Sequence, residues 1–426
     1  MTILLYFIAP VVLLALGIPV YAILLLTAIA GVATTAGLPL SVLQTSLFSS
    51  LDSFPLLAVP LFVLAGDIMG HGGLAKRMIA WAMSLIGGIR GSLALTTIAS
   101  AELFGAMSGS SIGCVAAIGR LLFPPLRDKG YGQTFGIGII ASSGAIAVII
   151  PPSIPMIIYG IAAQQSIPAL FLAGIIPGIM IGALASIYVL LFAHIKFVPL
   201  AAKARWTNIL ESTRDAVWSL GAPAVILGGI YGGIFTPTEA AGVAVVYAAL
   251  VSRYVYREVT WLDLWHVTRN SMYLVSQLMI IIAAAGVYSW LITTSGFPQQ
   301  LVGLVRSMDM SALEFLLWMN VLLLIVGSFL EPPAAILILT PILMPIVHTL
   351  GIDPIHFGMI MTINLAIGMF TPPFGLNLFA AHAIFNVPLP QIYRGVLPFI
   401  GVYIIGLLLV TYAPPISLFL LRFYGA

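Results

Sequence analysis

The residues in this sequence with the clearest chemical potential are small hydroxyl side chains and tandem prolines inside long apolar runs. Three serines lie in the stretch Ser108-Gly109-Ser110-Ser111, between two apolar arms. The proline pairs at 151–152 and 372–373 interrupt apolar runs, since proline removes a backbone donor and clashes with the preceding turn. An interrupted helix is tolerated in a membrane only where its freed polar groups face protein or a water-filled cavity. The breaks therefore predict a polar site inside a membrane protein.

Two sodium sites are predicted where these groups meet, because hydroxyls and freed carbonyls can ligate sodium without adding a net charge. One site uses the serine-rich stretch and the first break, and the other uses a tip near 331–334 and the second break. The first comprises Ser108, Ser110, Ser111, Ser143, Gly144, Val148 and Pro151, and the second comprises Glu331, Pro333, Ala334, Asn364, Gly368, Thr371 and Pro372. The alternative for the serines is helix packing, since small residues let membrane helices approach closely.

Enzyme motifs are absent from the sequence, which has no GxxxxGK[ST] phosphate loop, no HExxH pair and only scattered histidines. The single cysteine, Cys114, rules out an intramolecular disulfide. Four acids lie in or beside apolar runs: Asp67, Glu102, Glu239 and Glu331. Glu331 is the functional candidate because it lies at a predicted tip, whereas Glu239 follows a helix-start pattern and is interpreted as structural. We predict that this chain is not an enzyme.

The composition indicates a polytopic, all-α membrane protein. Of the 426 residues, 61% are hydrophobic and 7% are charged, whereas a soluble protein carries roughly 25% charged residues. The net charge of +3 reflects membrane topology and does not suggest nucleic acid. We predict a re-entrant hairpin over 92–123 with a broken transmembrane helix over 131–163, and a second hairpin over 313–349 with a broken helix over 357–386.

The sequence divides into two related halves. Adding 221 maps several glycines and prolines of the first half onto the second, as from Pro151 to Pro372. An odd number of membrane crossings in each half makes the repeat inverted. We predict repeats over 1–195 and 218–426, joined by a polar cytoplasmic segment over 196–217.

The basic residues orient these halves. With the N-terminus outside, all lysines and arginines except Arg306 and Arg422 fall in cytoplasmic loops, in keeping with the positive-inside rule. The first hairpin then enters from the cytoplasm and the second from the opposite side, which is an alternating-access geometry.

Together, these motifs resemble a known family. The sequence is similar to the large membrane (M) subunit of tripartite ATP-independent periplasmic (TRAP) transporters, in the ion-transporter superfamily. The resemblance spans nearly the whole chain and includes the stretches at 61–67, 108–111, 150–155, 233–240, 337–345, 371–373 and 394–398.

The resemblance implies an elevator-type transporter in the bacterial inner membrane. A sodium gradient would drive the uptake of a C4-dicarboxylate, sialic acid or another small organic anion. A soluble periplasmic binding protein (P type) would deliver the substrate, and a small four-helix membrane subunit (Q type), which we expect outside this chain, would accompany it in the lipid bilayer. The residues expected to bind the substrate are Ser110, Pro152, Ser153, Pro373 and Asn377.

The alternative is a stand-alone sodium- or proton-coupled anion transporter of the same superfamily that needs no binding protein. A channel is a further possibility from another class, although two opposed hairpins fit a gated carrier better.

Overall fold

Every element in the computed structural model is a helix within the residues it describes, which are 6, 8–34, 39, 41–200 and 204–423. The first half contains α1 (Ala9–Ala15), α2 (Val20–Thr34), α3 (Ser41–Leu51), η2 (Phe54–Leu57), α4 (Ala58–His71), α5 (Leu74–Leu85), α6 (Ser92–Ser108), α7 (Ser111–Leu126), η3 (Arg127–Tyr131), α8 (Gln133–Ile149), α9 (Ile154–Ala162) and α10 (Ile167–Ile195). The second half contains α11 (Trp206–Tyr231), α12 (Pro237–Leu250), η4 (Val251–Val255), α13 (Trp261–Thr294), α14 (Phe297–Ser307), α15 (Ala312–Phe329), α16 (Pro332–Thr349), α17 (Pro354–Gly368), α18 (Leu376–Phe385), α19 (Leu389–Tyr412), α20 (Pro415–Leu418) and η5 (Leu420–Phe423).

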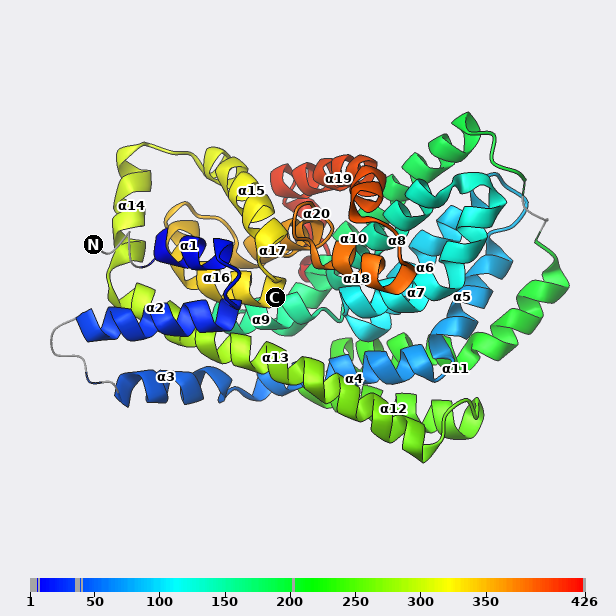
Figure 1. Cartoon of the computed structure of the whole chain (residues 1–426), viewed down its shortest axis with the longest axis horizontal. Coiled ribbons are helices and arrows are strands. Elements are labelled where there is room, and N and C mark those ends of the chain that lie inside the picture. Colours follow the sequence, from blue (N-terminus) through cyan, green and yellow to red (C-terminus); the bar gives the residue numbers. More distant parts are fainter. Residues whose placement is uncertain (1–5, 7, 35–38, 40, 201–203, 424–426) are drawn as a thin grey trace.

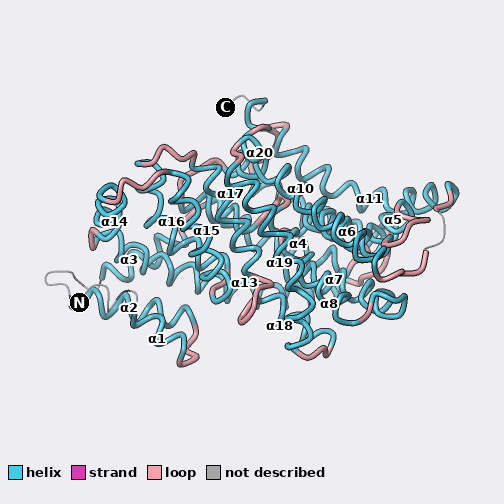
Figure 2. Tube along the Cα trace, turned by 90° about the horizontal axis from the view of Figure 1, so that it is seen from above, coloured by secondary structure: helices cyan, strands magenta, loops and turns pink. Residues whose placement is uncertain are grey.

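The fold confirms the predicted all-α, multi-spanning class. Six of the described helices are long and apolar enough to cross a membrane, and a seventh span is formed if the bent pair α8 and α9 is counted as one. The molecule is elongated, with α14 near one end of its long axis and α5 near the other (Figures 1 and 2).

The two halves repeat the same order of helices. Helices α6 to α10 start within one residue of the positions that a shift of 221 assigns to α15 to α19. The predicted hairpin over 92–123 corresponds to α6 and α7, and that over 313–349 corresponds to α15 and α16. The predicted broken helices correspond to the pairs α8–α9 and α17–α18.

One pair of counterparts differs between the halves. Helix α13 is continuous over 34 residues, whereas its counterpart in the first half is split into α3, η2 and α4. The split falls at Asp52 and Ser53, because Pro55 has no N–H to donate to the carbonyl of Leu51 and its ring would clash with that carbonyl in a continuous helix. The position equivalent to Pro55 in α13 is Ser276, so no such break arises there.

The predicted polar segment over 196–217 is partly helical. Residues 201–203 lie outside the described residues, and from Trp206 onward the segment belongs to α11, which begins well before the apolar run. The charged side chains of Glu211 and Arg214 point to the exposed side, while Ala216 is buried. The polar stretch is therefore the amphipathic start of a long helix.

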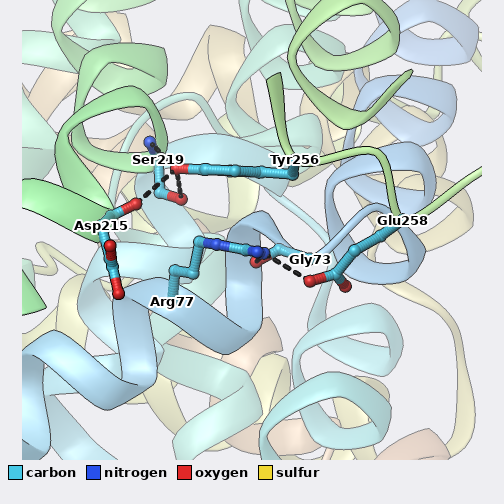
Figure 3. A network of polar contacts seen from close by, with 6 residues as sticks. All are labelled: Gly73, Arg77, Asp215, Ser219, Tyr256 and Glu258. Carbon is cyan, nitrogen blue, oxygen red and sulfur yellow. Dashed lines mark hydrogen bonds and ion pairs between the residues drawn. The ribbon is translucent and has the colours of Figure 1, made fainter. Parts of the chain in front are cut away.

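Polar contacts fix α5 against α11 and the loop before α13 (Figure 3). The guanidinium of Arg77 lies 3.8 Å from the ring centroid of Tyr256 and donates to Glu258 over 2.6 Å. The hydroxyl of Tyr256 accepts from the backbone N–H of Ser219 and donates to the carbonyl of Asp215. This network joins three segments that lie far apart in the sequence.

The two broken helices occupy the centre of the protein. All residues from Phe135 to Ile149 in α8 and from His356 to Gly368 in α17 are buried. A helix that is apolar on all sides must be surrounded by other helices. Helices α8 and α19 touch at the backbone, since a Cβ on Gly138 would lie 2.1 Å from the carbonyl oxygen of Gly395.

Candidate transport site

The tip of the first hairpin is closed by its own serines. Ser108 ends α6, Gly109 adopts a left-handed conformation with φ of 58°, and Ser110 caps α7. The Ser110 hydroxyl accepts from the backbone N–H of Gly113 at 3.2 Å, and the backbone N–H of Ser110 points at the Ser108 hydroxyl at 3.4 Å. Two predicted sodium ligands therefore satisfy the ends of the hairpin helices.

The tip lies directly against the first break. A Cβ on Gly109 would lie 2.4 Å from the carbonyl oxygen of Pro152, so only glycine fits between the tip and the break. Pro151 and Pro152 are both buried, and the peptide bond between them is cis. The structure thus brings the predicted tip and break residues of the first site together.

Asn377 connects this tip to the second half of the chain. The Ser111 hydroxyl donates to Asn377 Oδ1 at 2.8 Å, and Asn377 Nδ2 donates to the carbonyl of Ala141 at 2.9 Å. Gly144 leaves room for this contact, because a Cβ there would lie 2.9 Å from both Asn377 Nδ2 and the Ser111 carbonyl oxygen. Asn377 was predicted as a substrate ligand, and it lies beside two residues of the first predicted sodium site, with Ser143 buried next to them in α8.

The carbonyl of Val148, predicted to be free for sodium, has a partner in this conformation. The Ser153 hydroxyl donates to it across the break, and the same hydroxyl accepts from the backbone N–H of Met156 as the cap of α9. Ser153 is fully buried. The Val148 carbonyl is therefore satisfied within the break, and it retains a second lone pair for another donor or an ion.

The second hairpin ends differently from the first. Glu331 precedes α16 and makes no side-chain capping bond within the described chain, and its carboxyl is half-buried. Pro333 and Ala334 follow it and are buried. The tip contacts the second break through the rings of Phe329 and Phe374, whose centroids are 5.5 Å apart.

The second break is wider and more exposed than the first. It extends from Gly368 to Leu376, with Pro372 half-buried and Pro373 exposed, and the peptide bond between the prolines is cis. The Thr371 hydroxyl donates back to the carbonyl of Ile367 at 2.8 Å. The carbonyl of Pro373 accepts a hydrogen bond from the Tyr393 hydroxyl at 2.9 Å.

Comparison with known proteins identifies the family. The family model described as "Tripartite ATP-independent periplasmic transporter, DctM component" matches residues 7–416. The C4-dicarboxylate TRAP transporter large permease protein DctM of Pseudomonas aeruginosa is 42% identical over 90% of this chain and 90% of its own length. The chain belongs to the DctM family of TRAP transporters.

Another DctM-family relative is longer than this chain. The isethionate TRAP transporter permease protein DctMQ of Oleidesulfovibrio alaskensis is 39% identical over 95% of this chain, which covers 64% of the relative. The fold is also shared with the YdaH transporter of Alcanivorax borkumensis, at a TM-score of 0.62 and 14% identity, with 95% of this chain and 98% of that chain covered.

Membership in the DctM family confirms several predictions. The predicted resemblance to the TRAP large permease is correct, and the chain is a multi-pass membrane transporter component and not an enzyme. Glu239 has the structural role assigned to it, since it forms a capping box with Thr236 at the start of α12.

Sequence reasoning missed the surroundings of Asn364 in this DctM-family chain. Its Nδ2 donates to Asn320 Oδ1 and to the carbonyl of Ile360, both at 2.8 Å, while its Oδ1 is buried without a partner in the described chain. Asn320 in turn donates to the Thr411 hydroxyl at 3.1 Å. Asn364 thus faces α15 and α19, and Gly368 lies one turn further on against Gly327. A lone asparagine in an apolar helix was the available signal, because burying an amide requires hydrogen-bond partners.

Proposed function

We propose that this chain is the large permease of a sodium-coupled TRAP transporter that imports a small organic anion across the bacterial inner membrane. The observation that carries the proposal is that each half places a hairpin tip against a broken helix, through Gly109 and Pro152 in the first half and Phe329 and Phe374 in the second. Such breaks in opposite halves are the places where transporters bind ions and substrate.

Sodium fits the groups available at these two places. Sodium is a hard cation that prefers oxygen ligands, and hydroxyls, amide oxygens and carbonyls dominate both breaks. Within the described residues no group of three or more His, Cys, Asp or Glu side chains could hold a metal ion, so a transition-metal role has no support. We assign the ions to the predicted sets around Ser110 and Glu331, with the unpartnered Asn364 Oδ1 as a ligand of the second.

The substrate would lie between the two tips, near Asn377. The DctM relative is named for C4-dicarboxylates and the DctMQ relative for isethionate, which are both small organic anions. The family description names one component of a tripartite system, so we propose a periplasmic binding protein and a small membrane subunit as partners. The hairpin-bearing helices would move against α2, α4, α12 and α13 in an elevator cycle.

Sodium dependence of uptake in proteoliposomes tests this function. The permease is reconstituted with its small subunit and binding protein, and uptake is measured against external sodium, with choline as the replacement ion. We expect no uptake in choline, and we expect Ser110→Ala and Glu331→Ala each to raise the sodium concentration for half-maximal uptake about tenfold, equivalent to ~1.4 kcal/mol.

Ser166→Ala is the matched control for the serine. Ser166 caps α10 through a bond from the backbone N–H of Ala169 at 3.3 Å, the same local role that Ser110 has in α7. Both variants lose a helix cap, but only Ser110→Ala also loses a proposed sodium ligand, so only that variant should change the sodium dependence. Equal sodium curves for the Ser110 and Ser166 variants, or uptake by the permease alone, would contradict the proposal as stated.

A further inference from the structure

A narrow groove of about 250 Å³ runs between α7 of the first hairpin and the end of α4. On α7 it is lined by Gly113, Ala117 and Arg120, which share one face of the helix. On α4 it is lined by Gly66, where a Cβ would lie 2.6 Å from the Cβ of Ser108. The groove therefore begins beside the hairpin tip and ends at Arg120.

The two acids that line the groove are already engaged. Asp67 accepts a hydrogen bond from the Ser271 hydroxyl at 2.6 Å. Glu258 pairs with Arg77 at 2.6 Å, which in turn lies over the ring of Tyr256 (Figure 3). Glu258 is thus neutralised by Arg77, whereas Asp67 is bonded to a neutral hydroxyl and keeps its charge. The two cations at the rim still outnumber this one uncompensated acid, so the lining has an excess of positive charge.

Two cations at the rim have no such partner. Lys76, at the start of α5, and Arg120, on α7, both line the groove and are exposed at its outer end. Neither forms an ion pair with an acid in the part of the chain that the structure describes. A residue that only anchors the topology would extend toward lipid headgroups, whereas these two lie on a cavity between packed helices.

We propose that Arg120 and Lys76 form a second anion site, distinct from the one at the hairpin tips, which binds the carboxylate or sulfonate of the substrate as it leaves toward the cytoplasm. This inference rests on the proposed function. The guanidinium of Arg120 offers a planar set of donors that matches a carboxylate, and the lysine supplies a second charge. Arg120 lies seven positions after Gly113 on the same helix, so the site lies roughly 10 Å from the first turn after the tip.

The rate at which charged thiol reagents react inside the groove tests this site directly. Cysteine is introduced at Ala117 together with Cys114→Ala, because Cys114 is the only native thiol. Two membrane-impermeant methanethiosulfonates, one carrying a sulfonate and one a trimethylammonium, are applied from each face in phosphatidylcholine vesicles. We expect reaction from the cytoplasmic face, with the anionic reagent favoured.

Arg120→Gln and Lys76→Gln should each lower the ratio of anionic to cationic rates at least about threefold. Arg127→Gln is the control, because Arg127 is exposed, pairs with Asp128 and lies one helical segment beyond the groove. Millimolar succinate should slow the anionic reagent in the control and not in Arg120→Gln. Equal ratios in the Arg120 and Arg127 variants, or no protection by succinate, would overturn the site.

Two further measurements distinguish a substrate site from a lipid-binding site, and this inference from the proposed function. If phosphatidylglycerol in the vesicles abolishes the preference for the anionic reagent, the cations bind a lipid headgroup and the proposal is wrong. The sodium dependence of uptake is measured in the same variants. Loss of that dependence in the native sequence would overturn the proposed function, while the labelling ratios would still decide whether the groove attracts anions.

Discussion

Gly109 shows how one missing side chain sets the geometry of the hairpin tip. Its backbone is left-handed, and the carbonyl of Pro152 occupies the space where a Cβ would lie. The sequence motif pointed to the flanking serines as the chemical groups, yet their hydroxyls also bond to the backbone of the tip itself. The glycine between them determines how closely the tip approaches the break.

Gly109→Ala should therefore be far more damaging than an alanine at another left-handed glycine. Gly233 provides the comparison, because its φ is 67° and nothing lies within 4 Å of its Cβ position. There, alanine costs about 1–2 kcal/mol of backbone strain alone. At Gly109 the clash at 2.4 Å is added, so we expect a larger fall in melting temperature in detergent and at least a tenfold loss of uptake. Similar losses for the two variants would show that the tip can move away from the break.

At the scale of helices, α7, α8 and α18 share a buried polar contact that links the two halves. The amide oxygen of Asn377 accepts from Ser111, and its amide nitrogen donates to Ala141. Another crossed contact joins α9 to the second half, where the hydroxyl of Tyr159 donates to the carbonyl of Pro354 at 2.6 Å. The second half thus supplies Asn377 to the surroundings of the first break, and the first half supplies Tyr159 to the start of α17.

A double-mutant cycle on Ser111 and Asn377 tests this link. Each alanine leaves a buried group of the other residue unpaired, at a cost of about 1–3 kcal/mol, so the second substitution should add little to the first. We expect the melting temperature of Ser111→Ala/Asn377→Ala to fall by clearly less than the sum of the single variants. Ser111→Ala combined with Asn320→Ala should be additive, because Asn320 belongs to the separate network around Asn364 and Thr411.

The sequence predicted the hairpins and breaks well because their signals are local. Tandem prolines and small residues act on the backbone where they stand, so their positions mark the interruptions directly. The contact of Ser111 with Asn377 could not be predicted, because it depends on how helices from different halves pack. The partner of Asn320 could not be predicted for the same reason. The start of α11 was missed because its polar residues were interpreted as a connecting segment, although they also suit the exposed face of an amphipathic helix.

At the scale of the whole molecule, the two halves have the same order of helices but differ in how those helices pack. The first break is buried and the second reaches the surface at Pro373 and Phe374. Helices α5 and α14 each pack against a helix of their own hairpin, α6 and α16 respectively. Only α5 is also covered by α11, to which Trp81 donates a bond at Thr213 over 3.0 Å. The two ends of the molecule's long axis are therefore packed differently (Figure 1).

Cysteine labelling from each side of the membrane can check the predicted orientation of the chain. In a Cys114→Ala background, a cysteine at the exposed Asn208 of α11 should react with an impermeant maleimide only from the cytoplasmic side. A cysteine at Ser307, at the exposed end of α14, should react only from the periplasmic side. Labelling of both positions from the same side would contradict the predicted topology.

The bond between Ser111 and Asn377 also bears on how such a chain could have arisen by duplication. A polypeptide holding only the first half would leave Ser111 and Ala141 without their amide, and one holding only the second would leave Asn377 without its partners. A half-length form of this chain would thus need a second polypeptide to satisfy these groups. Joining both halves in one chain makes that pairing permanent, and it allows the halves to differ, as the continuous α13 and its split counterpart do.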